Sequence, residues 1–316
     1  MIEIVNQSVN PYFNIASEEY LLKNFEHDCF MLWRNAPSLI IGKHQNTLAE
    51  ININFAEKND IKVVRRISGG GTVYHDLGNL NFTFITNHDN NKIINFALFL
   101  KPITELLNNY EINVKLNKRN NLFVENKKIC GTAAHIHKNK IIHHGTLLFA
   151  TNIDSLENAI KINYENFTDK SIKSVNNIVT NINEHIKTKI SINEFAEQLS
   201  QKINADFISK EKYFLSDADI LAINELVKTK YKTWEWNYGY SPNYNFNKSS
   251  KNNLLNISVE VKKGIITNLK IYGINNFSKI ENILKGVKHL KSEIFNSIKN
   301  IEIENVSKGE FLELFF

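Results

Sequence analysis

Three consecutive glycines stand in the middle of the stretch Arg65-Arg66-Ile67-Ser68-Gly69-Gly70-Gly71-Thr72-Val73-Tyr74-His75-Asp76. Residues 63–64 before it and 80–85 after it have strand-like composition, which predicts a tight connection between two pieces of sheet. Runs of glycine cost chain entropy and occur where the backbone takes a positive φ or approaches a ligand closely. Exposed N–H groups in such a loop bind anions. No Lys-Ser/Thr pair follows, so the stretch is not a P-loop.

Three glycines alone are more typical of an ordinary hairpin than of a ligand loop. The residues on either side change that balance. Arg65 and Arg66 precede the glycines and can donate in pairs to a carboxylate or phosphate, and a His-Asp pair follows. The sequence therefore predicts a loop that binds an anionic ligand.

Composition indicates a packed protein with room for one large and one smaller domain, since 42% of its 316 residues are hydrophobic and 22% are charged. The net charge of +5 is spread along the chain, which argues against a nucleic-acid-binding stripe. Cys29 and Cys130 do not form a CxxC pair, so no disulfide framework or zinc site is expected. No signal peptide or membrane-length apolar run is visible, which predicts a cytoplasmic protein without a membrane partner.

Strands dominate the predicted elements of the first 150 residues. We expect a helix over residues 16–25, strands over 30–34 and 38–42, and a helix over 93–109 that is interrupted near Pro102. Two separate hairpins are expected next, one pairing residues 122–124 with 127–131 and one pairing 133–136 with 141–150. Strand sets separated by long helices indicate the α+β class.

The pattern becomes more helical after residue 150. A capping box at Ser191 opens one helix, and residues 216–227 form another with Ile220, Ile223 and Val227 facing inward. The aromatic, turn-rich residues 234–242 resemble a boundary, and a small α+β unit begins near residue 253. We expect a large domain of mixed and antiparallel sheets flanked by helices over residues 1–245, and a small α+β domain over 246–316.

Lys128 is the strongest candidate for chemistry outside the glycine loop. On a strand it faces away from Lys127 and shares a face with Cys130, so it can point into a pocket and stabilise charge during attack on an acyl group. Two solvated lysines are the ordinary alternative. Cys130 is either a reactive thiol or, more commonly, an inert buried residue.

The histidines do not predict a metal site. His143 and His144 are adjacent on a strand and point to opposite faces, so they cannot both bind one metal in the usual way. Such a pair more often has one packed and one exposed ring. His135 and His137 share a face, but a metal there is the minority interpretation.

These stretches together resemble the lipoate-protein ligase family, within the fold shared with biotin ligases and octanoyltransferases. The resemblance covers nearly the whole chain and depends on residues 10–16 with Glu18-Glu19, 41–46 with Glu50, 65–84, 128–133, 144–148 and 173–175. Residues 65–84 carry the most specific part. The small terminal unit is similar to the accessory domain of the bacterial ligases.

The resemblance implies a reaction in two steps with ATP and Mg²⁺. Lipoate and ATP give lipoyl-AMP and pyrophosphate, and the lipoyl group then moves to a lysine of a lipoyl-domain protein. Such acceptors are the E2 subunits of 2-oxoacid dehydrogenases and the glycine cleavage H protein. Lys128 is the implied catalytic residue, with Arg66 and the backbone of residues 71–74 on the nucleotide and Asn79 on adenine. The full implied set is Arg66, Ser68, Gly69, Gly70, Gly71, Thr72, Val73, Tyr74, His75, Asn79, Lys128, Gly131, Thr132, His144 and Gly145.

Two departures from the family pattern bear on this interpretation. Asn121 stands where the family often has Asp, so it is placed beside the Mg²⁺ site without the usual carboxylate. Asn176-Asn177-Ile178 replaces arginines in a segment that orders over the adenylate in relatives. Two rival hypotheses stay open: an ATP-independent octanoyl or lipoyl transferase that works through Cys130, and a noncatalytic nucleotide- or RNA-binding protein.

Overall fold

The computed structural model describes residues 1–316 apart from 88–93, 161–163, 209–210, 251–253 and 304–305. Its strands are β1 (Ile2–Val5), β2 (Cys29–Trp33), β3 (Ser38–Ile41), β4 (Lys62–Arg65), β5 (Val73–His75), β6 (Asn79–Asn87), β7 (Lys115–Leu116), β8 (Leu122–Val124), β9 (Lys127–His137), β10 (Lys140–Leu148), β11 (Phe167–Asp169), β12 (Lys212–Phe214), β13 (Tyr244–Ser249), β14 (Asn256–Lys262) and β15 (Ile265–Tyr272). Its α-helices are α1 (Pro11–Asn24), α2 (Thr47–Glu50), α3 (Ile53–Lys58), α4 (Phe96–Asn109), α5 (Ile153–Ala159), α6 (Ile192–Asp206), α7 (Asp217–Leu226), α8 (Ser278–Leu284), α9 (Lys291–Ile298) and α10 (Lys308–Glu313). Short helical turns are η1 (Tyr164–Asn166), η2 (Ile182–Glu184), η3 (Val227–Tyr231) and η4 (Glu235–Gly239).

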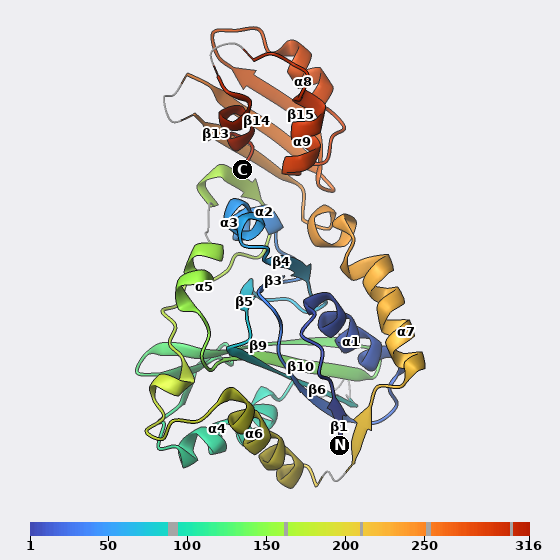
Figure 1. Ribbon diagram of the computed structural model, residues 1–316, viewed down its shortest axis with the longest axis vertical. Coiled ribbons are helices and arrows are strands. Elements are labelled where there is room, and N and C mark those ends of the chain that lie inside the picture. Colours follow the sequence, from blue (N-terminus) through green and yellow to red (C-terminus); the bar gives the residue numbers. More distant parts are fainter. Residues whose placement is uncertain (88–93, 161–163, 209–210, 251–253, 304–305) are drawn as a thin grey trace.

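The largest sheet has the strand order β12-β1-β2-β6-β10-β9-β8-β7 and is antiparallel except where β1 pairs with β12 and β2. Figure 1 shows α1 and α7 on one side of it and α4 and α6 on the other. The alternation of β6 explains both faces. Leu80, Phe82 and Phe84 pack in the core with α4 and α6. The residues between them, Asn81 and Thr83, are therefore directed to the face that carries α1.

A smaller sheet of order β4-β3-β5 holds the glycine loop, which connects β4 to β5. β3 runs parallel to β4 and antiparallel to β5. Its apolar side chains Leu39 and Ile41 belong to a core cluster that continues into the C-terminal unit. The loop is thus supported from behind by packing that includes both parts of the chain.

The C-terminal unit is a four-stranded sheet, β11-β13-β14-β15, covered by α8, α9 and α10 (Figure 1). β11 comes from residues 167–169, long before the rest of this sheet, and pairs antiparallel with β13. The expected division after residue 245 falls inside β13, which begins at Tyr244. We therefore propose that the C-terminal domain begins before Tyr244 and takes β11 as an additional strand.

The α+β class is confirmed, with mixed sheets flanked by helices and a separate small sheet-and-helix unit. The two expected hairpins are joined, because β9 is one continuous strand that pairs with β8 on one side and β10 on the other. Pro102 does not interrupt α4, whose buried face holds the helix together across the missing bond. Ile220 is 38% exposed, so its inward assignment was wrong, whereas Ile223 is fully buried.

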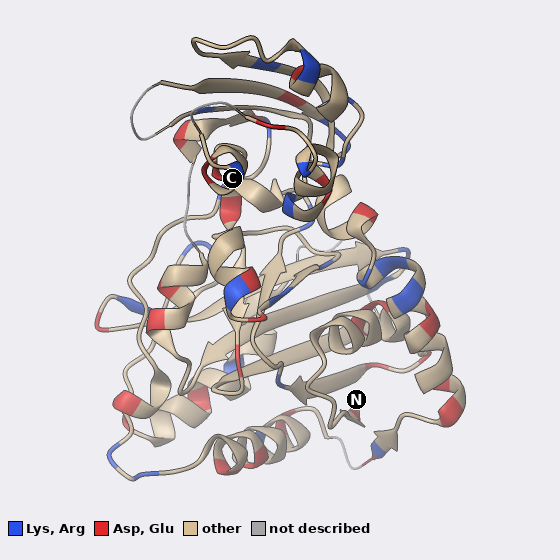
Figure 2. Ribbon diagram, turned by 45° about the horizontal axis from the view of Figure 1, so that its top comes forward, with Lys and Arg blue, Asp and Glu red and all other residues tan. Residues whose placement is uncertain are grey.

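Charges of both signs are interspersed over the elements of both parts of the molecule (Figure 2). Within the described residues, no helix has both the length and the apolar character needed to cross a bilayer.

Candidate active site

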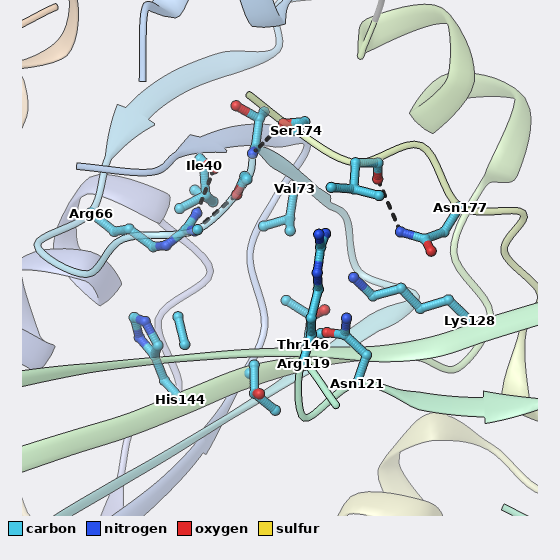
Figure 3. A pocket seen from close by; sticks show the side chains of 18 of the residues that line it. Ile40, Arg66, Val73, Arg119, Asn121, Lys128, His144, Thr146, Ser174 and Asn177 are labelled. Carbon is cyan, nitrogen blue, oxygen red and sulfur yellow. Dashed lines mark hydrogen bonds between the residues drawn. The ribbon is translucent and has the colours of Figure 1, made fainter. Parts of the chain in front are cut away.

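A cavity of about 480 Å³ opens beside the face of the large sheet that carries α1 (Figure 3). Its wall combines that sheet, the glycine loop, and a segment that follows β11. The lining residues are Ile15, Trp33, Ile40, Arg66, Gly70, Gly71, Thr72, Val73, His75, Asn81, Asn117, Arg119, Asn121, Lys128, Gly131, Thr132, Ala133, His144, Gly145, Thr146, Ile172, Lys173, Ser174, Val175 and Asn177. Figure 3 shows Arg119 and Lys128 on one side of the pocket and Ile40, Arg66 and His144 on the other.

The glycine loop needs its glycines for two different reasons. Gly70 has a φ of +89°, a conformation that residues with a side chain rarely adopt. A Cβ on Gly71 would lie 2.9 Å from the Ser174 hydroxyl, so the segment that follows β11 could not close on the loop. Thr72 N–H donates to that same hydroxyl at 3.0 Å. The loop is therefore shaped to receive residues 172–177 over its backbone.

Arg66 stabilises the glycine loop, because most of the N–H groups of its guanidinium donate to protein atoms. Its Nε donates to Ser68 Oγ at 3.0 Å, and Nη1 donates to the Ile40 carbonyl at 2.9 Å. Nη2 donates to the carbonyls of Gly69 and Gly71 at 2.6 and 2.8 Å. Burial lowers the pKa of Arg66 to about 10, which leaves the guanidinium charged at neutral pH. Arg66 therefore adds positive charge to the cavity wall, and its hydrogen bonds fix the conformation of the glycine loop.

Arg65 faces away from the cavity. Its side chain is fully buried and donates to carbonyls in the loop after β3 and to the turn η4 near the C-terminal unit. The hypothesis that both arginines donate to a ligand is therefore wrong for Arg65. Its role is to join the segment after β3 to the connection that leads into the C-terminal unit.

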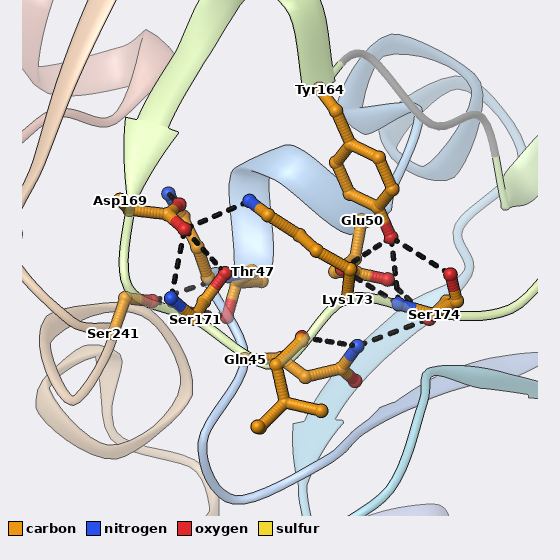
Figure 4. A network of polar contacts seen from close by, with 11 residues as sticks. Gln45, Thr47, Glu50, Tyr164, Asp169, Ser171, Lys173, Ser174 and Ser241 are labelled. Atoms are coloured by element: carbon orange, nitrogen blue, oxygen red, sulfur yellow. Dashed lines mark hydrogen bonds and ion pairs between the residues drawn. The ribbon is translucent and has the colours of Figure 1, made fainter.

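The segment that closes over the glycine loop is anchored by a compact polar network (Figure 4). Ser174 Oγ accepts from Gln45 Nε2 at 3.0 Å and donates to the Glu50 carboxylate. Tyr164 donates to Glu50 at 2.8 Å and accepts from the Ser174 N–H at 2.7 Å. Lys173 forms an ion pair with Asp169 at 2.8 Å. The segment is thus attached to α2 on one side and to β11 on the other.

Lys128 presents an ammonium to the cavity. Its Nζ lies 3.0 Å from the place where a Cβ on Gly131 would be, so the glycine gives it room. Burial lowers the pKa of Lys128; Cys130 opposes this effect, and the nearby Arg66 and Arg119 add smaller lowering effects. No described residue forms a hydrogen bond or ion pair with the ammonium. An anion entering the cavity would therefore meet an unneutralised cluster of positive charge.

The opposite side of the cavity carries a buried relay of hydrogen bonds. Glu18 lies beside His144 Nδ1 at 2.8 Å, and His144 Nε2 lies 2.6 Å from Ser68 Oγ. Thr83 donates to Glu18 at 2.6 Å and accepts from Trp33 Nε1 at 2.9 Å. In Figure 3, His144 and Lys128 lie on opposite sides of the pocket. These hydrogen bonds fix the positions of the wall residues His144 and Trp33, on the side of the cavity opposite Lys128.

Cys130 is fully buried, and burial raises the pKa of its thiol to about 12. Its thiol packs among Leu122, Ile129 and Leu147 rather than in the cavity wall. Because the thiolate is the nucleophilic form, this environment keeps Cys130 unreactive at neutral pH.

Most residues implied by the resemblance line the cavity, including Lys128, His75, Asn121, Thr132, His144 and Gly145. Four of them do not line it among the described residues: Ser68, Gly69, Tyr74 and Asn79. Ser68 acts on the wall through His144, and Tyr74 is packed in a core cluster. Asn79 is fully buried and donates to Asn81 at 2.8 Å, so it has no surface for adenine in this conformation.

Sequence reasoning missed part of the wall. Asn81 follows Asn79 at strand spacing and Thr146 follows His144 in the same way, so period-two alternation could have found both. Trp33 and Arg119 carry no comparable local signal. Trp33 is placed by the pairing of β2 with the distant strand β6, and Arg119 lies in the connection between β7 and β8.

The described cavity wall contains no carboxylate, and no described group of three His, Cys, Asp or Glu side chains could hold a metal. Asn121 contributes only a neutral amide. Hard cations such as Mg²⁺ prefer anionic oxygen ligands, so these residues do not fit a metal site made by the protein alone.

Comparison with known proteins follows the same division of the chain. Residues 10–204 match the family model described as lipoyl protein ligase A/B catalytic domain, and residues 241–315 match bacterial lipoate protein ligase C-terminus. Lipoate-protein ligase LplJ of Bacillus subtilis is 38% identical over 100% of both chains. Lipoate–protein ligase 1 of Staphylococcus aureus is 41% identical over 90% of this chain and 89% of its own. The crystal structure of P. falciparum LipL1 in complex with lipoate is 25% identical, with a TM-score of 0.63 over 99% of this chain and 97% of that one.

Proposed function

This chain belongs to the lipoate-protein ligase family, and from that membership we propose that it activates lipoate with ATP as lipoyl-AMP and then lipoylates a lysine of an acceptor protein. One observation carries the proposal. Lys128 is an ammonium without a partner among the described residues, and it projects into a cavity bounded by a glycine loop. A carboxylate and a phosphate are the groups that such a charge would hold together.

The two sides of the cavity suit the two substrates. Ile15, Trp33 and Ile40 offer apolar surface for the acyl chain. Arg119 and Lys128 offer charge for the triphosphate, and Arg66 adds to the same field. The backbone of residues 70–73 supplies the close approach that a phosphate needs.

In the first step, a carboxylate oxygen of lipoate attacks the α-phosphorus of ATP. An O–P bond forms, the bond to the β-phosphate oxygen breaks, and pyrophosphate leaves. The ammonium of Lys128 neutralises charge that builds on the α-phosphate and keeps the two anions from repelling each other. This charge stabilisation is the contribution expected of Lys128 to the first barrier.

In the second step, the neutral amine of an acceptor lysine attacks the carbonyl carbon of the mixed anhydride. The C–N bond forms, the C–O bond to AMP breaks, and the amine loses a proton to solvent. Lys128 again faces the oxygen on which charge develops, because both steps are centred on the same group of atoms. We propose lipoyl domains of 2-oxoacid dehydrogenase E2 subunits or the glycine cleavage H protein as acceptors, in the cytoplasm.

Mg²⁺ would enter with the nucleotide rather than occupy a site of its own. Mg²⁺ is commonly bound through substrate phosphates and retains several waters, which is compatible with a wall that offers only neutral ligands such as Asn121. Lys128, Arg119 and Arg66 supply positive charge from the protein itself.

Burial of Cys130 disfavours the rival acyltransferase. An acyl-thioester route needs an accessible thiolate, whereas this thiol is fully buried with a raised pKa. We expect Cys130→Ser to retain transfer to the acceptor.

Pyrophosphate release on mixing the protein with Mg-ATP and lipoate tests the proposal. Lys128→Ala should lose at least about 100-fold in rate, as when a transition-state charge partner is removed. Lys127→Ala is the matched control, because Lys127 is the neighbouring lysine and is exposed. Transfer of lipoyl groups without pyrophosphate release, or equal rates in the two variants, would contradict the proposal.

A further inference from the structure

We propose that His75 and Asn81 form a polar end to the acyl pocket, which recognises the sulfur-bearing ring of lipoate and rejects a plain alkyl chain of equal length. This inference rests on the proposed function, since it assumes that the acyl chain occupies the apolar side of the cavity. It assigns substrate selectivity to two residues whose side chains each have a buried polar atom with no partner among the described residues.

A chain of hydrogen bonds fixes which ring nitrogen of His75 carries the proton. Asn14 Nδ2 donates to the carbonyls of Ser8 and Arg34, both at 2.9 Å, which sets the orientation of its amide. The same nitrogen lies 2.9 Å from Asn35, so Asn35 faces it with oxygen, because two amide nitrogens would repel. Asn35 Nδ2 is then the atom 3.1 Å from His75 Nδ1 and donates to it. The proton of the neutral ring consequently lies on Nε2.

That N–H has no acceptor among the described residues, although His75 is only 3% exposed. The ring is neutral at physiological pH, because burial, with Arg66 and His144 nearby, lowers the pKa of His75 to about 3. Buried donors without partners are uncommon in folded proteins and call for an explanation. Since His75 lines the cavity, a bound ligand can supply the missing acceptor.

Asn81 has the same property. It is 1% exposed and lines the cavity, and its Oδ1 accepts from Asn79 while its Nδ2 has no partner among the described residues. Reversing both amides would exchange the free atom but would still leave one polar atom of Asn81 unpaired. The indole N–H of Trp33 in this part of the wall is already paired, because it donates to Thr83.

The sheet register places Asn81 at the distance expected for the end of an acyl chain. Trp33 is opposite Asn81, Asn81 is opposite Thr146, and Thr146 is opposite Gly131. Gly131 is the residue beside the Lys128 ammonium. Adjacent strands are about 4.8 Å apart, so Asn81 lies roughly 10 Å from Gly131 across the sheet. An extended eight-carbon acyl chain is about 9 Å long, which brings its far end to Asn81 when its carboxylate is at Lys128.

His75 closes the same end of the pocket. Its ring packs edge-on against Trp33, with 6.0 Å between ring centroids, and Trp33 is the cross-strand neighbour of Asn81. Sulfur is a weak acceptor of hydrogen bonds, but a methyl group accepts none. An octanoyl chain would cover these polar groups and leave them unpaired, whereas a dithiolane offers each a partner. Sites that leave buried polar groups unpaired discriminate against the analogue that lacks the partner.

The test measures lipoate- and octanoate-dependent ATP–pyrophosphate exchange and compares kcat/KM for the two acids. The wild-type protein should favour lipoate by about tenfold or more. Asn81→Leu and His75→Phe should each lower that preference at least about fivefold, by lowering kcat/KM for lipoate more than kcat/KM for octanoate, and urea unfolding checks that each variant is folded. Thr146→Val is the matched control, because Thr146 lies in the same row nearer Lys128 and should affect both acids equally.

A wild-type protein that uses both acids equally would overturn the inference. So would a preference for lipoate that neither variant changes, including a loss of activity on both acids together. If one variant does not fold, the other decides. Failure of the wild-type protein to exchange pyrophosphate with either acid would instead refute the proposed function, so the two failures are distinguishable.

Discussion

Replacing Arg65 with Met should destabilise the protein strongly. The Arg65 side chain is fully buried, and its five N–H groups are distributed over acceptors in two separate segments, namely the carbonyls of Gly42, Lys43, Gln45, Trp236 and Asn237 and the hydroxyls of Thr47 and Ser241. Met fills a similar length but donates nothing. The substitution therefore removes the tie between the loop after β3 and the connection to the C-terminal unit.

The expected loss follows from the acceptors that are left behind. Among the described residues, Arg65 is the only donor to the carbonyls of Lys43 and Gln45. Leaving a buried acceptor unpaired costs about 1–3 kcal/mol, so these two carbonyls and the remaining contacts give about 4 kcal/mol. That is a large fraction of the stability of an ordinary domain.

Urea unfolding followed by tryptophan fluorescence measures this loss as a change in the free energy of unfolding. Arg34→Met is the matched control, because Arg34 is half-buried and its side chain makes one long hydrogen bond to the described residues, to the Leu77 carbonyl at 3.3 Å. It should cost less than about 1 kcal/mol. A loss of under about 1 kcal/mol for Arg65→Met, or equal losses in the two variants, would refute the assignment of Arg65 as the tie.

Three further outcomes are expected. Burial lowers the pKa of His289 to about 4, so the unfolded chain binds an extra proton as pH falls from about 6.5 to 4, and stability declines in that range. Urea unfolding should show that, between pH 7 and 4.5, the wild-type protein loses about 2 kcal/mol more free energy of unfolding than His289→Gln. Equal losses in the two proteins would contradict this. Burial raises the pKa values of Cys29 and Cys130 to about 12, so iodoacetamide should label neither in the native protein and both in urea, whereas rapid native labelling of Cys130 would revive the acyltransferase hypothesis. Ser174→Ala removes the hydroxyl that joins Thr72 to Glu50 and should raise KM for ATP or lipoate about threefold or more with little change in kcat. An unchanged KM would show that residues 172–177 do not cover the bound substrate.

The glycine loop could be predicted from the sequence because its signal is local: three glycines between two strands specify a special backbone. Alternation along β6 and β10 would likewise have found Asn81 and Thr146. Lys128 does line the cavity, but the prediction that it shares a strand face with Cys130 was wrong, because Cys130 packs in the core. The register of β8 and β9 shifts between Lys128 and Cys130, and such a shift depends on strand pairing that alternation does not contain.

The arginines illustrate what local sequence does not contain. Arg65 and Arg66 are adjacent and chemically identical, yet their side chains bind different parts of the chain. Arg65 donates to the carbonyls of Trp236 and Asn237, more than 150 positions away, whereas Arg66 donates to carbonyls of the glycine loop itself. Only the packing of η4 against β4 decides this. β11 is similar, because a three-residue strand has no periodicity to read and gains its identity from pairing with β13.

Ile220 is exposed and α4 continues through Pro102, and both cases show the limits of predicting structure from spacing and helix propensity alone. Ile220 has the spacing of a buried position, but α7 packs on α1 through a narrower face that Ile223 occupies. Pro102 should break a helix, but Phe99, Ile103 and Leu106 anchor α4 on both sides of it. Tertiary packing overrides the local preference in both cases.

Transfer of an oxygen atom tests the central claim most directly. Lipoate labelled with oxygen-18 in its carboxylate is incubated with the protein, Mg-ATP and a lipoyl-domain acceptor, and the AMP produced is analysed by mass spectrometry. Formation of lipoyl-AMP joins a carboxylate oxygen to the α-phosphorus, and attack by the acceptor lysine breaks the C–O bond, so the account predicts one oxygen-18 atom in each AMP. Unlabelled AMP, or label found instead in inorganic phosphate, would contradict an adenylate intermediate.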